Sequence, residues 1–536
     1  MRRTASPPPH RHPGLVPGSI VVRASPVGGQ HARSFNRSQT VRSDSDGPRN
    51  KSGVTLGSEG RPALPRFILL TAFTLAACST VERAPPASSA EAALPPSFAL
   101  LDRERAGSGS LADLLPRQDP AFVELERRAL TDAPTLLAAL ARIDAARAGV
   151  RGARAERFPN VQASGSVTRQ RINPGAQFGG DLPPGVAIEP GQTQFRAGLD
   201  ASFDADLFGR LRASERAARL RVDAADADAA GVRLALTGDI ARTVVDARAL
   251  DRREAVVRRD IASAEELVAV TRVRSRAGIA PEFDLVRAQS LEADARARLQ
   301  PILSERAAVL GRLVTLTGLP TSEVQGQLAA PPGPGLTAVP ALSVPSTLLR
   351  GRPDVAAAER RLAAADQEIA AAAADRFPRL TITAALGLFA LTGGGLFSDD
   401  AIVGFVGPGL AGPLLDFGRV GARIDQRQAE AREAFANYRD ALFTALGETE
   451  QALGQITAAD ARAVALERQA FLDRDAAGLA RERYRRGLDT FLTVIDAERT
   501  ANTSQANAIE ARADASRTRV ALYRAVGGEA GAKAAP

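Results

Sequence analysis

The sequence is poor in the residues that carry most enzymatic and metal chemistry. Trp is absent, and Cys and Met occur once each in 536 residues. The three histidines, His10, His12 and His31, all lie within the first sixty residues. Because His is the commonest metal ligand and general base, the rest of the chain lacks the usual group for either role. The sequence also shows no motif of an enzyme that works through carboxylates or a Ser-Lys pair. We therefore expect no catalytic residue, metal or cofactor.

The body of the chain also lacks net charge. Residues 1–60 carry nine Lys/Arg against three Asp/Glu, and Arg61 and Arg66 account for the rest of the +8 excess. The rest of the chain has no net charge and therefore no electrostatic attraction to nucleic acid. Residues 1–60 are rich in Pro, Ser and Arg without periodicity, and we expect them to be disordered or to lie upstream of the true translation start.

The segment that follows has the features of a bacterial lipoprotein signal. Its apolar run, residues 67–77, is too short to span a bilayer and follows two arginines, which favours a signal peptide over residues 61–77. Leu-Ala-Ala-Cys at 75–78 fits the lipobox, in which the Cys is acylated and becomes the new N-terminus. We expect Cys78 to carry lipid and residues 78–118 to form a lipid-anchored tether. The alternative is a lone buried Cys.

The remaining sequence repeats itself. AERFPN at 155–160 returns as ADRFPR at 374–379, and FGR at 208–210 returns at 417–419. The two offsets differ by about ten residues, which places a longer loop in the first half. Duplication of this size favours a symmetric architecture.

Domain boundaries follow from this duplication. We predict a first structural repeat at 119–345 and a second at 346–528. Residues 529–536 are expected to form a disordered tail.

Each half contains segments in which apolar and polar residues alternate. Residues 161–168 and 194–204 do so in the first half and 380–388 in the second, so we predict β-hairpins at 161–204 and 380–411. Strands of about ten residues suffice for a tilted membrane crossing. A half-buried hairpin on a soluble core is the alternative. Four strands cannot close a lipid-facing barrel, for which about eight is the smallest number, so a membrane location requires an oligomer.

Long helices are predicted between the hairpins. Residues 210–277 and 419–486 contain no Pro and are rich in Ala and Arg, and each would extend roughly 100 Å as a helix. Gly278 and Gly487 are expected at the C′ positions that end these helices, and Asp489 at the N-cap of the second return helix. A generic coiled coil would account for the helices but not for the strands.

The most specific motif of the chain lies at the start of the second repeat. Residues 345–362 read PSTLLRGRPDVAAAERRL and lead to Arg-Phe-Pro at 376–378. With the two Phe-Gly-Arg marks, this sequence resembles the TolC family of outer-membrane channels over residues 110–528, most closely its lipoprotein branch that serves RND multidrug efflux systems. The resemblance implies an α+β membrane protein. Three copies, each with four transmembrane strands, would form a twelve-stranded β-barrel continued by an α-helical tunnel through the periplasm.

The resemblance also implies which residues form the inner mouth of the tunnel. Acidic side chains near the helix tips narrow that opening in the family, and the matching positions here are Asp284 and Asp496, with Tyr484 as a neighbouring gate contact. The alternative for either Asp is a solvated carboxylate in the first turns of a helix. Gly278 and Gly487 would mark the tips at which a periplasmic membrane-fusion adaptor docks.

The function that follows is a passive exit duct without catalysis. We expect it in the Gram-negative outer membrane, in contact with its lipid, with the helices in the periplasm. Its partners would be two further copies of itself, the adaptor and an inner-membrane RND transporter. A channel for a type I protein exporter is one alternative, and a lipid-anchored periplasmic scaffold of coiled coils is another.

Overall fold

The computed structural model describes residues 83–101, 110–171, 191–338 and 345–528. They all belong to the compact unit Ser79–Pro536. The predicted extension, the signal peptide, Cys78 and the tail at 529–536 lie outside the described residues.

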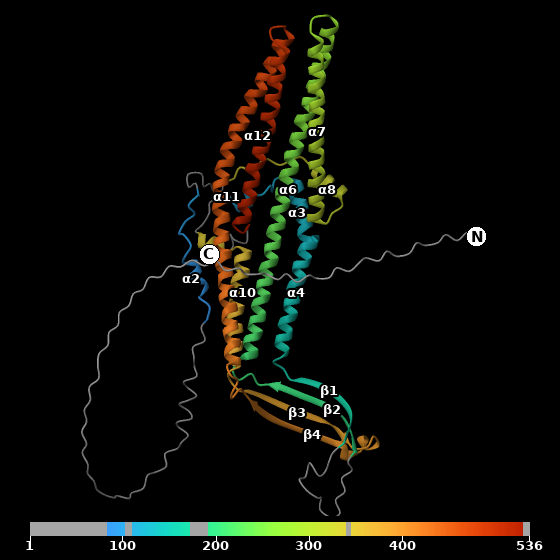
Figure 1. Cartoon of the computed structure of the whole chain (residues 1–536), viewed down its shortest axis with the longest axis vertical. Helices are drawn as coiled ribbons and strands as arrows, with labels where there is room; N and C mark the ends of the chain where they lie inside the picture. Colours follow the sequence, from blue (N-terminus) through green and yellow to red (C-terminus); the bar gives the residue numbers. More distant parts are fainter. Residues whose placement is uncertain (1–82, 102–109, 172–190, 339–344, 529–536) are drawn as a thin grey trace, which may run out of the picture. The chain divides into compact units, whose positions relative to one another are not determined.

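Each half of the chain has a helix, a β-hairpin and a long helical hairpin, in that order (Figure 1). The first half begins with two short elements, α2 (Ala87–Glu91) and the 3-10 helix η1 (Leu111–Leu114). The main elements of the first half are α3 (Pro120–Asp132), α4 (Pro134–Ala155), β1 (Asn160–Arg171), β2 (Gly191–Asp204), α6 (Arg210–Arg276), α7 (Glu282–Thr317) and α8 (Thr321–Leu328). Those of the second half are α9 (Pro345–Arg350), α10 (Pro353–Ala374), β3 (Arg379–Ala390), β4 (Ile402–Ala411), α11 (Arg419–Arg485) and α12 (Phe491–Ala525). Two 3-10 turns, η2 (Gly394–Phe397) and η3 (Asp399–Ala401), join β3 to β4.

The equivalent helices of the two halves match in length. α4 and α10 have 22 residues each, and α6 and α11 have 67 each. α7 and α12 have 36 and 35 residues. α6 and α11 grow long because no Pro interrupts them and because Ala, which has the best helix propensity, is their commonest apolar residue. The predicted long helices are therefore present, and each reaches roughly 100 Å.

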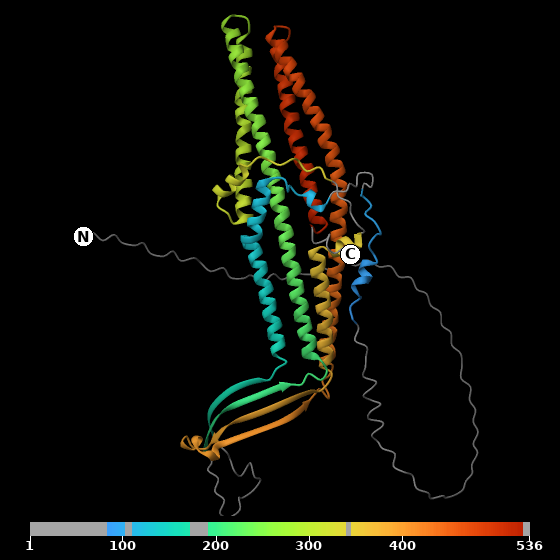
Figure 2. The same ribbon diagram turned by 180° about the vertical axis from the view of Figure 1, so that it is seen from behind.

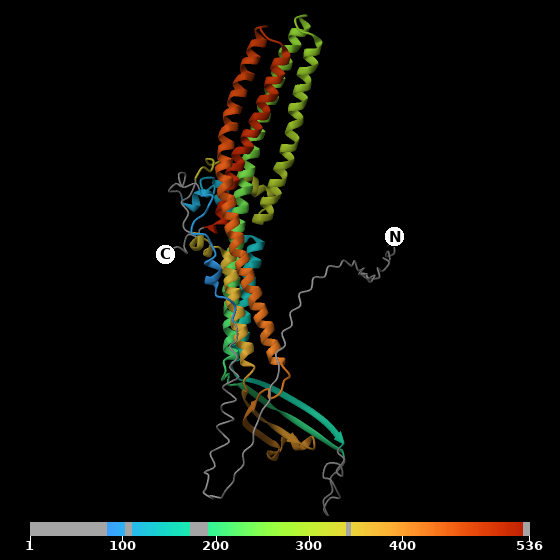
Figure 3. The ribbon, with the colours of Figure 1, turned by 60° about the vertical axis from the view of Figure 1, so that its left-hand side comes forward.

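The four strands form a single antiparallel sheet in the order β1-β2-β3-β4. Two of its three pairings lie within hairpins, whereas the pairing of β2 with β3 joins the two halves, from Phe195 opposite Ala390 to Asp204 opposite Thr381. The sheet lies at one end of the long helices, and the turns of the helical hairpins lie at the other (Figures 2 and 3). The mostly helical chain with a four-stranded sheet agrees with the predicted fold class.

The main hydrophobic core lies midway along the helices. It brings together Leu114 of η1, Phe122 of α3, Ile240 of α6, Leu313 of α7 and Leu453 of α11, all of them buried. Away from this core, the long helices bury alanine more often than any other residue. Small side chains let helices approach closely, so the hairpins pack along their length without a wide apolar layer.

The segment predicted to be a tether is packed onto the helices over its described part. Ala90 of α2 is buried beside Tyr438, whose hydroxyl donates to Glu91 over 3.1 Å. The backbone amides of Ala99 and Leu100 donate to the carboxylate of Glu450 on α11. Composition alone predicted a tether, and the scattered apolar residues of its described part bury enough area to hold that part against the helices.

Candidate functional site

One face of the sheet consists only of apolar residues and glycine through its central part. Directly opposed residues of an antiparallel pair project to the same side, so Ala163, Leu199, Leu386 and Gly404 form one row of this face. The complete set is Val161, Ala163, Gly165 and Val167 on β1, Phe195, Ala197, Leu199, Ala201 and Phe203 on β2, Leu380, Ile382, Ala384, Leu386, Leu388 and Ala390 on β3, and Ile402, Gly404, Val406, Pro408 and Leu410 on β4. We call it the apolar face.

The apolar face is exposed. Leu199 is 52% exposed, Leu386 62%, and Val406 76%. From Phe195 to Phe203 the apolar stretch of β2 extends roughly 26 Å, close to the height of the lipid-facing band of membrane barrels. Beyond Val167 the next residue on this side of β1 is Arg169, where the apolar band ends.

The opposite face is polar on β1 and β2. Asp200 projects there, and its carboxylate accepts a hydrogen bond of 2.7 Å from the hydroxyl of Ser164. Arg196 lies over the ring of Phe389 on β3, 5.1 Å from its centroid. Leu199 and Asp200 thus lie on opposite faces, as the alternation in the sequence predicts.

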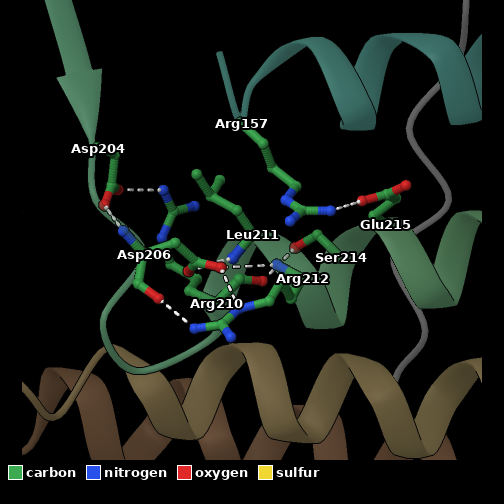
Figure 4. A network of polar contacts seen from close by, with 8 residues as sticks. All are labelled: Arg157, Asp204, Asp206, Arg210, Leu211, Arg212, Ser214 and Glu215. Carbon is green, nitrogen blue, oxygen red and sulfur yellow. Dashed lines mark hydrogen bonds and ion pairs between the residues drawn. The ribbon is translucent and has the colours of Figure 1, made fainter. Parts of the chain in front are cut away.

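A network of carboxylates and arginines fixes the connection from β2 to α6 (Figure 4). Asp206 adopts a left-handed backbone, with φ of 48°, and its carboxylate accepts hydrogen bonds from the amides of Leu211 and Arg212 at 2.9 and 3.0 Å. Asp206 therefore satisfies amides of the first helical turn that have no partner within the helix. Arg157, which lies just after the end of α4, donates a hydrogen bond to Glu215 of α6 and lowers the pKa of that carboxyl. The sheet is joined to the helices by polar contacts rather than by a loose loop.

The two distal turns are closed by the same backbone motif. Gly278 and Gly487 have φ of 71° and 75°, which glycine adopts without strain. Beyond them the amide of Ile279 donates to the carbonyl of Arg274, and that of Leu488 to the carbonyl of Arg483, both at 2.9 Å. This is the Schellman motif expected for a glycine at C′.

The return helix after Gly487 begins one residue later than predicted. Thr490, not Asp489, is its N-cap, and the Thr490 hydroxyl accepts from the amide of Thr493. The carboxylate of Asp489 instead accepts from the Thr490 amide, the Thr493 hydroxyl and the Arg483 guanidinium. Asp489 supports the turn without occupying the cap position.

The three predicted gate residues lie near these turns in different surroundings. Asp284 lies in the first turn of α7 and is half-buried. Asp496 is exposed on α12 and, with Asp473 and Thr493, lines a hollow of about 420 Å³ between α11 and α12. Asp284 is not among the residues that line that hollow.

Tyr484 is buried and connects the two helical hairpins. The guanidinium of Arg274, on α6, donates to the Tyr484 carbonyl over 2.9 Å and lies 4.8 Å from the centre of its ring. The ring also packs against Phe491 of α12 at 5.3 Å. A second contact between the hairpins joins Arg485 of α11 to Glu266 of α6.

Further charged residues between the hairpins were not predicted. Asp260, Arg298, Arg481 and Glu498 come one from each of α6, α7, α11 and α12. Arg481 lies 2.8 Å from Glu498, although no hydrogen bond of acceptable geometry reaches that carboxylate oxygen. Burial raises the pKa of Glu498 and that of Asp260. In helices so rich in Arg, Asp and Glu, no sequence signal separates these residues from their solvated neighbours.

Other kinds of site find no support in the described residues. No group of three or more His, Cys, Asp or Glu residues in them is arranged to hold a metal ion. Of the helices described, none is long and apolar enough to cross a membrane.

The chain thus combines long paired helices with a four-stranded antiparallel sheet whose apolar face is exposed. The family model for outer membrane efflux proteins matches residues 125–319 and 344–528. The chain therefore belongs to the outer membrane efflux protein family. This family comprises efflux ducts and is not a class of enzymes.

Individual relatives share most of the chain. The pyoverdine export outer membrane protein OpmQ of Pseudomonas putida is 31% identical over 475 residues, covering 87% of this chain and 98% of its own. The toluene efflux pump outer membrane protein TtgI of Pseudomonas putida is 30% identical, with the same coverage. A solved structure of the outer-membrane channel OprN superposes with a TM-score of 0.71 at 30% identity, covering 84% of this chain and 98% of that one.

Proposed function

We propose that this protein is the outer-membrane exit channel of a tripartite efflux pump and that it works as a homotrimer. The observation that carries the proposal is the apolar face, whose middle is left exposed by the described elements. Four strands are too few to close a lipid-facing barrel, and β1 and β4 leave two open edges. Three copies of the sheet would give a twelve-stranded barrel in which every edge is paired.

The long helices extend the duct away from the membrane. α6 and α11 each reach roughly 100 Å, a length suited to crossing much of the periplasm. Family members are named for pyoverdine export and toluene efflux, which fits a duct that accepts small molecules delivered to it. The duct itself is passive, and the energy comes from an inner-membrane RND transporter.

The distal turns are the proposed docking points for a periplasmic adaptor. Ile279 and Leu488, each one residue beyond its turn glycine, are 67% and 64% exposed. The neighbouring Phe283 of α7 is also largely exposed. Apolar side chains gathered at the tips of both hairpins favour contact with another protein over contact with water.

The inner mouth of the duct is the proposed gate. Asp284 and Asp496 would face the axis of the trimer, where carboxylates from three chains gather and favour cations. Tyr484 would hold the two hairpins of one chain together through Arg274, so that an adaptor opens the mouth by separating them.

A lipid on Cys78 is the proposed anchor of the mature N-terminus in the outer membrane. Palmitate labelling of the wild type, and none of Cys78→Ser, is the expected result. Equal labelling of both would contradict it. Since the barrel holds itself in the membrane, Cys78→Ser should reduce assembly without releasing the protein into the soluble fraction.

The barrel is tested by two neighbouring substitutions on β2. Leu199→Arg places a charge on the apolar face, at a cost of about 2–4 kcal/mol near the middle of a bilayer. Asp200→Arg places the same charge on the polar face and serves as the matched control. We expect the yield of heat-modifiable trimer to fall much further for Leu199→Arg.

Equal trimer yields from the two variants would contradict a lipid-facing apolar face. A lipid-anchored periplasmic scaffold of coiled coils predicts that equality. It also predicts that Cys78→Ser releases the protein into the soluble fraction, whereas a barrel stays in the membrane without its lipid.

A further inference from the structure

The duplication places four phenylalanines at equivalent points of the two halves. Phe158 and Phe377 each lie between a helix and the first strand of a hairpin. Phe208 and Phe417 each lie between the second strand and a long helix, directly before Gly209 and Gly418. Each half therefore carries one aromatic ring where its hairpin begins and one where it ends.

Within the chain, two of these rings are stacked. Phe208 and Phe377 have centroids 4.5 Å apart and ring planes 13° apart. Phe208 belongs to the first half and Phe377 to the second, and the pairing of β2 with β3 brings them together. The backbone bond from the amide of Ala205 to the carbonyl of Leu380 continues this pairing toward the helices.

The other two rings have no stacked counterpart among the described residues of the chain. Phe158 is 58% exposed and Phe417 is 91% exposed. Phe158 leads into β1 and Phe417 follows β4, so they lie beside the two open edges of the sheet. Leu414 and Leu415, just before Phe417, are 100% and 74% exposed.

We propose that Phe417 of one copy stacks on Phe158 of the next copy. Within one chain, β2 ends the first hairpin and pairs with β3, which begins the second hairpin. In a closed ring of copies, β4 ends the second hairpin of one copy and must pair with β1, which begins the first hairpin of the next copy. The contact between copies then repeats the one between Phe208 and Phe377. This inference rests on the proposed ring of identical chains and adds its contact residues.

The turn that carries Phe417 holds its ring outward. Phe417 has φ of 52°, a conformation rare for a bulky residue. The carboxylate of Asp416 keeps the turn in place by accepting from the amides of Gly418 and Val420, at 3.1 and 2.9 Å. A strained backbone held by its neighbours is typical of a functional position.

The duplication predicts that Phe417 meets Phe158, but it does not predict the angle between their rings. In the first half the left-handed residue before the glycine is Asp206, not Phe208. The backbone therefore differs between the two turns that carry Phe208 and Phe417. The inference accordingly concerns which residues meet and not the tilt of their rings.

Cysteine pairs distinguish contact between copies from contact within a chain. Phe158→Cys with Phe417→Cys is treated in isolated membranes with a short bismaleimide crosslinker and run on a denaturing gel. We expect bands of dimer and trimer mass from the double variant and from neither single variant. The matched control, Phe208→Cys with Phe377→Cys, should crosslink within the chain and keep the mass of a monomer. Cys78, the only native Cys, is present in every sample.

The first pair is informative when its protein is trimeric by native gel and the control pair reacts. If it then gives no dimer or trimer bands, the inference is overturned, while the proposed trimer stands. A wild-type protein that is monomeric in membranes would instead overturn the proposed assembly.

A second measurement applies if the double cysteine variant fails to assemble. Phe417→Ala should lower the temperature at which the trimer dissociates in detergent. Phe397→Ala serves as control because Phe397 is also exposed, at 85%, but lies in η2 at the other end of the strands. An equal dissociation temperature for the two variants would contradict the inference.

Discussion

The middle of the helical assembly and its distal section bury charged groups in different ways. In the middle, the guanidinium of Arg248 binds both carboxylate oxygens of Asp119 and the carbonyls of Leu328 and Ala330. Arg519, only 1% exposed, repeats this chemistry with Asp460 and the carbonyls of three further residues, Thr337, Ala338 and Ala515. Both arginines are fully paired, and both tie connecting segments to the long helices.

The distal section, residues 260–298 and 473–498, is less well satisfied. It holds most of the buried side-chain polar atoms that lack a hydrogen-bond partner among the described residues, and only Arg210 Nε and Asp366 Oδ1 lie elsewhere. These atoms are Asp260 Oδ2, Thr271 Oγ1, Arg274 Nε, Arg298 Nε, Asp473 Oδ2, Tyr484 Oη and Glu498 Oε1.

This difference predicts that the middle is more stable and that the tips open more readily. An unpaired buried polar group costs free energy that is recovered when a local opening exposes it to water. Regions with such groups open more readily than a satisfied core. The distal section therefore suits the proposed gate, and the middle would hold the hairpins together when such a gate opens.

The largest expected effect is the loss of a paired arginine in the middle. Arg519→Leu leaves Asp460 and backbone carbonyls without their partner, and we expect a loss of about 3 kcal/mol in unfolding free energy. Circular dichroism of the purified protein in detergent, followed during heating, measures it. Arg462→Leu removes an exposed ion pair with Asp514, worth at most about 1 kcal/mol. Equal melting of the two variants would contradict the role of the middle.

A smaller and local effect is expected at the contact between the hairpins. Arg274→Ala removes the hydrogen bond to Tyr484 and the stacking on its ring, together worth about 1–2 kcal/mol. The tips should open roughly 5–30 times more often, and amide exchange near Tyr484 should accelerate while global melting stays unchanged. Arg276→Ala, two residues away on an exposed side chain, should change neither. A fall in global melting would show that Arg274 serves the fold instead.

The pH dependence of the tips should depend on Glu498. Its pKa is raised, because desolvation outweighs the attraction of Arg481, while Asp260 raises it further. A raised folded-state pKa means that the packing is most stable below the ordinary value of 4.5 and weakens as pH rises through the raised value.

Substitution tests this sign. Glu498→Gln mimics the protonated form, so the protection of tip amides from exchange, after correction for the intrinsic pH dependence of exchange, should rise and become nearly independent of pH between about 4 and 8. The pKa of Asp260 is raised as well, so Asp260 should cause the small pH dependence that remains in this variant. Glu482→Gln, at an exposed carboxylate on α11, is the control and should keep the wild-type slope. An unchanged slope in Glu498→Gln would contradict the assignment.

The smallest effect on stability is expected for the two predicted gate carboxylates. Asp284→Ala with Asp496→Ala should weaken cation selectivity in planar bilayers and lessen block by multivalent cations. Trimer yield should stay nearly unchanged, because Asp284 and Asp496 lie at the distal end, away from the strands. Wild-type selectivity in the double variant would show that both are solvated helix carboxylates. Asp473→Ala is a useful comparison, since Asp473 lines the same hollow as Asp496 but was not predicted to face the pore.

Much of the fold could be predicted because its signals are local. The absence of Pro, the glycines at 278 and 487 and the repeat itself gave the two long helices to within one or two residues. Alternation with a period of two placed Leu199 and Asp200 on opposite faces before any partner strand was known. The lipid on Cys78 stays a prediction, since Cys78 lies outside the described residues.

The site was less predictable because its contacts join distant segments. Tyr484 was predicted as a gate residue, but its partner Arg274 lies 210 positions earlier in the chain and is one of many arginines in these helices. Asp260 and Glu498 look like any other helix-surface carboxylate in the sequence.

The sequence by itself determined the duplication, the lengths of the helices and the two faces of the strands, because helix and strand periods are properties of neighbouring residues. Only the tertiary structure decided that Phe208 stacks on Phe377 while Phe158 and Phe417 stay exposed, and which charged residues lose contact with water. Burial depends on how helices of roughly 100 Å pack against one another. A small rotation of either helix about its axis would bury a different carboxylate. The sequence pattern of a single helix therefore does not predict which carboxylate is buried.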